Sequence, residues 1–157
     1  MIDYLLYEFN FSGRLLLKAD DQYLFKATWV EKAGPISLKQ KSPNPILKET
    51  IQQLKYYELN KIKTFELPIK LKGSEFQISV WKQLMQIPYG QTISYKELAT
   101  RIGNSQASRA VGNANNKNPI SVIIPCHRVI QKSGTIGGYR GGISNKSNLL
   151  DIERRSF

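Results

Sequence analysis

The chain has 157 residues, 41% of them hydrophobic, and 23 Lys and Arg outweigh 12 Asp and Glu to give a formal net charge of +11. No apolar run approaches the ~18 residues that span a bilayer, and Asp3 and Glu8 stand where a signal peptide would carry basic residues. A single cysteine excludes an intramolecular disulfide, and one Cys with one His cannot complete the usual ligand set of a structural zinc site. We therefore expect a cytoplasmic protein without a membrane anchor or a bound metal. The charge implies a polyanionic partner, with a merely solubilising surface as the alternative.

The positive charge is unevenly distributed along the chain. Residues 1–72 carry 12 Lys and Arg against 8 Asp and Glu, a net +4, whereas residues 73–157 carry 11 against 4, a net +7. The stretch 61–73 reads as a linker with one extended segment at 67–71. We therefore predict an N-terminal supporting α/β domain with its linker over 1–72, and a more basic C-terminal domain over 73–157 that binds the polyanion.

The N-terminal half has the pattern of a small sheet followed by a helix. Short apolar segments separated by Ser-Gly and Asp-Asp predict an antiparallel meander in the first thirty residues: 4–7, 15–17 and 23–25. The polar stretch 32–45 predicts a loop, and the apolar spacing within 46–60 predicts an amphipathic helix. No nucleophile, metal cluster or phosphate loop stands out in this half.

The C-terminal half begins and ends with predicted helices. Ser74 with Gln77 forms a capping box, which predicts a helix that runs to about residue 86. Near the end of the chain Ser144 is expected to cap a last helix, and Glu153 lies on that helix.

Two further short helices are predicted between these. Ser94 with Glu97 forms a second capping box, and the helix that it opens should end near Gly103. Ser105 is expected to cap the next helix, which should run to about Asn115. Two short helices joined by a tight turn are the pattern of a helix-turn-helix.

The second helix of this pair has one long cation, Arg109, on a surface of small residues. These small residues are Ala107, Ala110, Gly112 and Ala114. Close helix packing would account for them, and that reading stays open. Within a basic domain, we favour a helix that approaches a narrow groove of nucleic acid, where Arg109 can replace an extruded base.

The cysteine, Cys126, lies directly beside the sole histidine, His127, and is followed by Arg128. Free cysteine is often inert packing, but a neighbouring base and cation favour the thiolate, which is the nucleophilic form. The apolar run 120–124 predicts a short β-like segment that Pro125 stops. Adjacent side chains on an extended segment point to opposite sides, so we expect a water to bridge the thiol and the imidazole.

Two features downstream complete this candidate site. Glu153 is the best-placed carboxylate to orient the imidazole near the end of the domain. The glycine-rich loop 137–142 has neither a dinucleotide nor a Walker spacing, but its backbone can fold over a flat ligand, with Tyr139 as one wall of a base pocket.

The string Pro-Cys-His-Arg-Val at 125–129, with Asn-Pro at 118–119 and the glycine-rich loop 137–142, resembles the active-site signature of O6-alkylguanine-DNA alkyltransferases. The resemblance extends over roughly 74–155. It implies irreversible transfer of an alkyl group from O6-alkylguanine, and also from O4-alkylthymine, to Cys126 after base flipping. It also implies a single turnover, no cofactor, and a monomer that binds double-stranded DNA from the minor groove.

The resemblance assigns roles residue by residue. Cys126 is the nucleophile, His127 its water-linked base, and Glu153 the carboxylate that orients the imidazole. Asn118 holds the turn, and Tyr95 donates to the guanine ring as charge develops there. For Tyr95, the alternative of an aromatic core residue stays open.

The resemblance also implies a pocket and a DNA-contacting surface. The carbonyls of Cys126 and Val129 read the guanine amino group, beside Tyr139. Arg140 departs from relatives that carry a small hydroxyl residue there, which puts the tightness of the pocket in question. The residues expected to touch DNA are Lys96, Asn104, Arg109, Ala110, Gly112 and Lys132. For Lys96, Asn104 and Lys132, a merely solvated surface is the alternative.

The fold implied is α+β: a small N-terminal antiparallel sheet domain, ribonuclease H-like, followed by a mostly helical, winged-helix-like C-terminal domain with a helix-turn-helix. Other function classes stay open. They are a cysteine hydrolase, a winged-helix DNA-binding regulator with an incidental cysteine, and a non-catalytic alkyl-lesion sensor. Such sensors commonly carry tryptophan at the position of Cys126, which makes this cysteine the discriminating feature.

Overall fold

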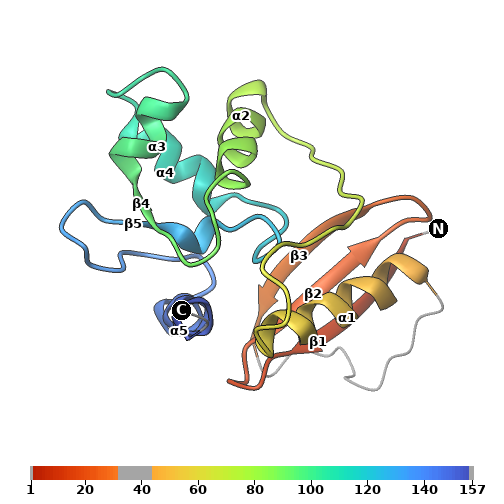
Figure 1. Ribbon diagram of the computed structural model, residues 1–157. Coiled ribbons are helices and arrows are strands. Elements are labelled where there is room, and N and C mark those ends of the chain that lie inside the picture. The colour runs from red at the N-terminus through yellow and green to blue at the C-terminus, as the bar shows by residue number, and fades with distance from the viewer. Residues whose placement is uncertain (1, 32–43, 156–157) are drawn as a thin grey trace. The chain divides into compact units, whose positions relative to one another are not determined.

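The structure is a computed structural model that describes residues 2–31 and 44–155 (Figure 1). The chain divides into two compact units. The N-terminal unit is Met1–Leu71 with Pro119–Ile123, and the C-terminal unit is Lys72–Asn118 with Ile124–Phe157. The predicted division between 72 and 73 differs from this in one main respect, since a short segment from the second half of the sequence belongs to the N-terminal unit.

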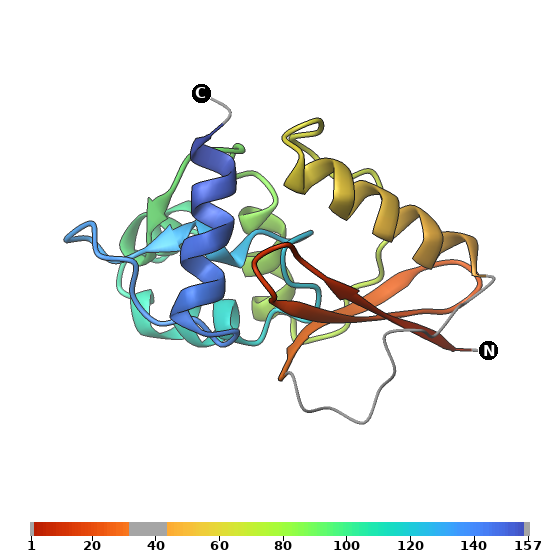
Figure 2. The ribbon, with the colours of Figure 1, turned by 90° about the horizontal axis from the view of Figure 1, so that it is seen from below.

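The N-terminal unit contains the predicted antiparallel meander. Strands β1 (Asp3–Glu8), β2 (Arg14–Ala19) and β3 (Leu24–Val30) form a three-stranded sheet in that order. Helix α1 (Pro45–Glu58) packs against β1 and β2 (Figure 2). The predicted meander and amphipathic helix are thus confirmed, whereas most of the predicted loop 32–45 lies outside the described residues.

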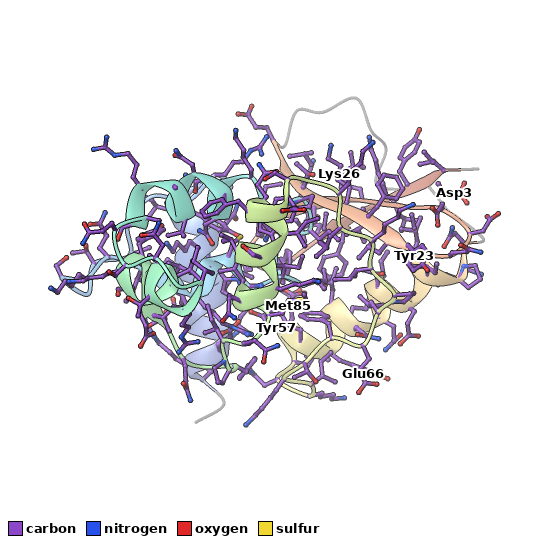
Figure 3. The ribbon with its side chains drawn as sticks, turned by 90° about the horizontal axis from the view of Figure 1, so that it is seen from above. Asp3, Tyr23, Lys26, Tyr57, Glu66 and Met85 are labelled. Carbon is purple, nitrogen blue, oxygen red and sulfur yellow. The ribbon has the colours of Figure 1, made fainter. Side chains whose placement is uncertain are left out.

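The core of this unit explains why these segments fold together. Leu15 and Leu17 on β2 are fully buried, as are Leu47 and Leu54 on α1. Tyr57 on α1 (Figure 3) is also fully buried, and its ring centroid lies 5.4 Å from that of Phe65. Alternation along β2 and helical spacing along α1 therefore put their apolar residues on facing surfaces.

Two later segments flank β3. Ile69 forms an isolated parallel bridge with Leu24, and Ile120 forms one with Ala27. The predicted β-like run 120–124 is not a continuous strand, because Val122 has a φ of 74° and the chain turns there between bridge residues. A left-handed conformation is unfavourable for a β-branched residue and breaks strand geometry. The run is apolar because it is buried. A buried irregular segment has the same apolar composition as a buried strand, so composition alone did not distinguish them.

The C-terminal unit is mostly helical (Figure 1). Its elements are α2 (Glu75–Leu84), β4 (Ile93–Ser94), α3 (Tyr95–Arg101), α4 (Ser108–Asn116), a 3-10 turn η1 (Cys126–Arg128), β5 (Val129–Ile130) and α5 (Ile143–Arg154). The short strands β4 and β5 pair in parallel, and α2, α3 and α4 pack against one another. Among the described residues, no helix has the length and apolar character needed to cross a membrane.

The helix signals read from the sequence were right for α2 and α3. The capping box of Ser74 and Gln77 is present in full, and Oγ of Ser94 accepts a hydrogen bond from the Glu97 amide. After α3 the chain turns through Gly103, whose φ of 90° suits glycine.

Two predicted caps were wrong. Helix α4 starts at Ser108 rather than after Ser105, because the side chain of Asn104 accepts from the Gln106 amide and extends the preceding turn. Helix α5 follows Gly142, whose φ is 93°, so Ser144 lies inside its first turn and caps nothing. In both places a local turn, rather than a serine side chain, decides where the helix begins.

Candidate active site

Cys126 opens a tight 3-10 turn that is almost entirely buried, since 3% of the residue is exposed. The Cys126 amide donates to the carbonyl of Ile124, and the Arg128 amide donates to that of Pro125. The sequence predicted an extended segment at Cys126 and His127, and the structure has a 3-10 turn there instead. Such a turn has about three residues per revolution, so neighbouring side chains still point in different directions. Val129 then pairs with Ile93 at the start of β5.

The imidazole of His127 and the carboxylate of Glu153 form a buried pair. Nε2 of His127 lies 2.6 Å from Oε2 of Glu153. Arg128 donates to the same carboxylate from Nε to Oε1 at 2.8 Å and from Nη2 to Oε2 at 3.1 Å. The Arg128 Nη1 donates to the carbonyl of Ile87, and the Gly90 amide donates to Oε1 of Glu153. The carboxylate is therefore held from several sides.

The charge states of the pair follow from burial and from these neighbours. Burial lowers the pKa of His127 below its ordinary 6.5, although Glu153 acts in the opposite direction. Burial also opposes ionisation of Glu153, but His127 and Arg128 outweigh it and hold the pKa of this carboxyl well below its ordinary value. A neutral imidazole beside a carboxylate carries its proton on Nε2, so Nδ1 is left as a proton acceptor.

Lys146 is a site residue that the sequence interpretation missed. It is fully buried on α5, where Nζ donates to the carbonyls of Val129 at 2.7 Å and Gly138 at 3.3 Å. Nζ also lies 5.8 Å from the ring centroid of Tyr139. Burial lowers the pKa of Lys146 to about 8, and the negative charge of Cys126 acts against this shift. The sequence does contain a sign that Lys146 is buried, because this cation lies one helical turn before Leu149 on the apolar face of α5.

Two phenols accompany the thiol. Sγ of Cys126 donates to Oη of Tyr139 at 3.6 Å. Burial raises the pKa of Tyr95 above its ordinary 10.0, and the charge of Cys126 adds to this shift. The α-carbon of Gly112 faces the Tyr95 ring, because a Cβ built there would lie 3.7 Å from two ring carbons.

Two asparagines from the end of α4 hold the backbone around the cysteine. Nδ2 of Asn118 donates to the carbonyl of Ile124 at 2.8 Å, so the residue expected to hold this turn contacts it. Nδ2 of Asn115 donates to the carbonyl of Cys126 at 3.4 Å. Asn115 was named in the sequence only as the end of a helix.

The remaining candidates are exposed residues on α3, on α4 and in the loops. Arg140 is exposed, and its Nη1 lies 3.5 Å from the carbonyl of Asn116 at the end of α4. Arg109 and Ala110 are exposed on α4. The other exposed residues expected at DNA are Lys96 on α3, Asn104 in the turn and Lys132 after β5. No cluster of His, Cys, Asp and Glu that could hold a metal ion occurs within 2–31 and 44–155.

Comparison with known proteins gives consistent matches. The family model described as "6-O-methylguanine DNA methyltransferase, DNA binding domain" matches residues 75–155. The methylated-DNA–protein-cysteine methyltransferase of Methanosarcina acetivorans is 41% identical over 143 residues, which cover 90% of this chain and 92% of that protein. The inducible protein of that name from Bacillus subtilis is 42% identical over 128 residues, 82% of this chain and 71% of that protein.

Solved structures agree with these sequence matches. The crystal structure of Mycobacterium tuberculosis O6-methylguanine methyltransferase superposes with a TM-score of 0.86 at 39% identity, covering 100% of this chain and 95% of that one. Mycobacterium tuberculosis OGT in complex with DNA gives 0.85 at 38% identity, covering 98% and 93%. The α+β architecture expected from the sequence is thus confirmed. From the family match over residues 75–155 and the relatives at 41% identity, the chain belongs to the 6-O-methylguanine DNA methyltransferase family.

Proposed function

We propose that this protein repairs DNA by irreversible transfer of an alkyl group from O6 of guanine to Sγ of its own Cys126. The observation that carries the proposal is the buried pair of His127 and Glu153: His127 follows Cys126 directly in the chain, and its Nε2 lies 2.6 Å from Oε2 of Glu153. The relatives named methylated-DNA–protein-cysteine methyltransferases support the same chemistry. A mere DNA-binding module would have no need of a base and its orienting carboxylate beside a cysteine.

The reaction begins with deprotonation of the thiol. Cys126 loses its proton through a bridging water to Nδ1 of His127, while Glu153 holds the imidazole through Nε2. The buried ammonium of Lys146 favours the thiolate electrostatically. The sulfur then forms a bond to the alkyl carbon as the bond from that carbon to O6 breaks.

The electron pair of the breaking bond moves to the guanine, which takes up one proton from solvent to end as the neutral base, and His127 later releases the thiol proton to solvent. Tyr95 donates a hydrogen bond to the ring as this charge develops, and burial keeps its phenol protonated by raising the pKa. The resulting thioether is a poor leaving group, so each molecule acts once. No step of this sequence calls for a cofactor.

The pocket for the flipped base is assigned to the residues around the thiol. The carbonyls of Cys126 and Val129 read the guanine amino group, and Tyr139 forms one wall. The Val129 carbonyl already accepts from Lys146 but has a second lone pair. Arg140 limits the mouth of this pocket, and O4-alkylthymine is the second substrate.

The DNA surface is assigned to α3, α4 and the loops beside them. Arg109 and Ala110 are exposed on α4, so a helix of small residues can enter the minor groove of double-stranded DNA while Arg109 fills the gap left by the flipped base. Lys96, Asn104 and Lys132 contact the DNA backbone. Gly112 has no side chain, so the Tyr95 ring can approach α4 closely. The net charge of +7 over residues 73–157 favours this binding.

The N-terminal unit is a ribonuclease H-like support, and the C-terminal unit is winged-helix-like. The protein works as a monomer, because repair of one base by one thiol requires no second copy. Its place of action is the cytoplasm.

Intact mass after incubation with a duplex that contains O6-methylguanine tests the function. We expect the wild-type protein to gain one methyl group and to saturate at one per molecule, and we expect Cys126→Ala to gain none. An unchanged wild-type mass with retained binding to the lesion would contradict the proposal and support a non-catalytic sensor.

A further inference from the structure

Two buried side-chain atoms have no hydrogen-bond partner among the residues that the structure describes: Oδ1 of Asn115 and Nδ1 of His127. Asn115 is 2% exposed and His127 is fully buried. Both flank the nucleophile, because Nδ2 of Asn115 donates to the carbonyl of Cys126 and His127 follows Cys126 in the chain. Buried polar atoms are costly to leave unpaired, so each of these two needs a partner.

The two atoms have the same hydrogen-bonding character. Nε2 of His127 faces the carboxylate of Glu153, which only accepts, so the imidazole proton is on Nε2 and Nδ1 accepts. Oδ1 of Asn115 also accepts, since the NH2 group of this amide faces the Cys126 carbonyl. Two acceptors cannot satisfy each other, whereas one water has a proton for each. Buried waters typically make about three hydrogen bonds to groups that are otherwise unsatisfied.

We propose that Asn115 is a positioning residue for the alkyl transfer, and that its Oδ1 and Nδ1 of His127 accept the two protons of one buried water whose oxygen faces the Cys126 thiol. This inference rests on the proposed function, in which a water links the thiol to the imidazole. With both of its protons directed to acceptors, the water presents a lone pair to the thiol, and the S–H proton turns to it from Oη of Tyr139. The thiol proton passes to the water oxygen as a proton of that water passes to Nδ1.

The surroundings of Asn115 fix it in place for this role. The Trp81 indole donates to the carbonyl of Ala114 at 2.9 Å, and the backbone N–H of Asn118 donates to the backbone carbonyl of Asn115 at 3.3 Å. The side-chain NH2 group of Asn115 donates to the Cys126 carbonyl. Its buried Oδ1 has no hydrogen-bond donor among the described residues. A backbone tie alone therefore does not explain this side chain.

Several charged and titratable groups surround Cys126 and His127, and they influence the pH dependence of the thiol. Those that act on His127 are Glu153, Arg128 and Lys146. Tyr139 contacts the thiol, and Tyr95 and Lys146 interact electrostatically with Cys126. None of these groups belongs to α4, which carries Asn115, so they are unchanged when Asn115 is replaced.

The pH dependence of the reaction of Cys126 with iodoacetamide tests the role without DNA. We expect Asn115→Leu, which has a similar volume but no polar atoms, to shift the profile upward by roughly one pH unit. Asn113→Leu, at an exposed position of the same helix, should leave it in place. Because Asn115 is proposed to act through His127, Asn115→Leu should add no further shift in a His127→Gln background. An unshifted profile, or an equal shift in both backgrounds, would overturn the inference.

A crystal structure of the free wild-type protein gives a second test that does not depend on the folding of a variant. We expect an ordered water within hydrogen-bond distance of both Nδ1 of His127 and Oδ1 of Asn115. Separate protein partners for these atoms, or a dry site between them, would overturn the inference. If the wild-type protein accepted no methyl group from DNA, the proposed function would fail, while the iodoacetamide profile would still decide the role of Asn115.

Discussion

Nε2 of His127 and Oε2 of Glu153 lie 2.6 Å apart, and both side chains are almost completely excluded from solvent. The two residues are 26 positions apart in the chain and meet because α5 packs against the turn η1. Arg128 shares the same carboxylate, so one buried anion is held by an imidazole and a guanidinium together. This cluster connects the stability of the C-terminal unit with the chemistry proposed at Cys126.

Glu153→Gln should be strongly destabilising. The change leaves the guanidinium of Arg128 buried without its counter-charge, and removal of one partner from a buried pair typically costs about 3–5 kcal/mol. Urea denaturation measures the free energy of unfolding. Asp151→Asn is the matched control on the same helix, because the contact of Asp151 with Arg154 is exposed and long, at 3.9 Å. An equal loss in the two variants would contradict this account.

Stability should fall as the pH is lowered from neutral. The pKa of His127 is lowered in the folded state, so its contribution is complete above the ordinary 6.5 and declines below it as the unfolded chain takes up a proton. The pKa of Glu153 is lowered too, and its contribution declines as the pH falls below the ordinary 4.5. Denaturant midpoints at a series of pH values show both effects. His127→Gln should flatten the curve just below 6.5, and a curve as steep as that of wild type would argue against a buried neutral imidazole.

Lys146→Met should slow the reaction of Cys126 with iodoacetamide at pH 7. Loss of a nearby ammonium disfavours the thiolate, and we expect a rate roughly tenfold lower. The wild-type ammonium loses its proton as the pH rises through about 8, so the difference between the two proteins should shrink above that pH. The exposed Lys132→Met serves as control. A difference that persisted undiminished at high pH would point to a packing effect instead.

Arg109→Ala should separate DNA handling from thiol chemistry. Without a side chain to fill the space of the flipped base, single-turnover methyl transfer from duplex DNA should slow by about one to two orders of magnitude. The reaction with iodoacetamide should not change, because Arg109 is exposed on α4 and has no contact with Cys126 among those described. Arg154→Ala, an exposed cation on α5, should affect neither rate. Equal losses in both reactions would mean that Arg109 supports the fold rather than the DNA.

Gly73→Ala should destabilise the C-terminal unit. A Cβ at this position would lie 2.7 Å from a ring carbon of Trp81, which is 2% exposed and held in the core. Overpacking of this kind typically costs about 1–3 kcal/mol. Gly138→Ala is the control, since a Cβ there would meet no described residue within 4 Å apart from its chain neighbours. Thermal unfolding of the two variants compares them directly, and a Gly73→Ala midpoint equal to that of wild type would show that Trp81 can shift.

The sequence by itself determined the features that depend on neighbouring residues. The meander followed from short apolar segments and their turns, α1 from its apolar spacing, and the start of α2 from Ser74 and Gln77. It also pointed to the thiol, since one cysteine beside one histidine in the string 125–129 carries a family resemblance. Each of these signals lies within a few residues, where propensity and capping act directly.

Tertiary structure alone decided which distant groups meet. It buried Lys146 against the Val129 carbonyl, and it turned the chain at Val122 where the sequence favoured a strand. It also buried Asn115 beside Cys126 with no hydrogen-bond partner for its Oδ1 within 2–31 and 44–155. An apolar pattern reports that a residue is buried, but its hydrogen bonds and its charge state are set by whichever segments pack against it.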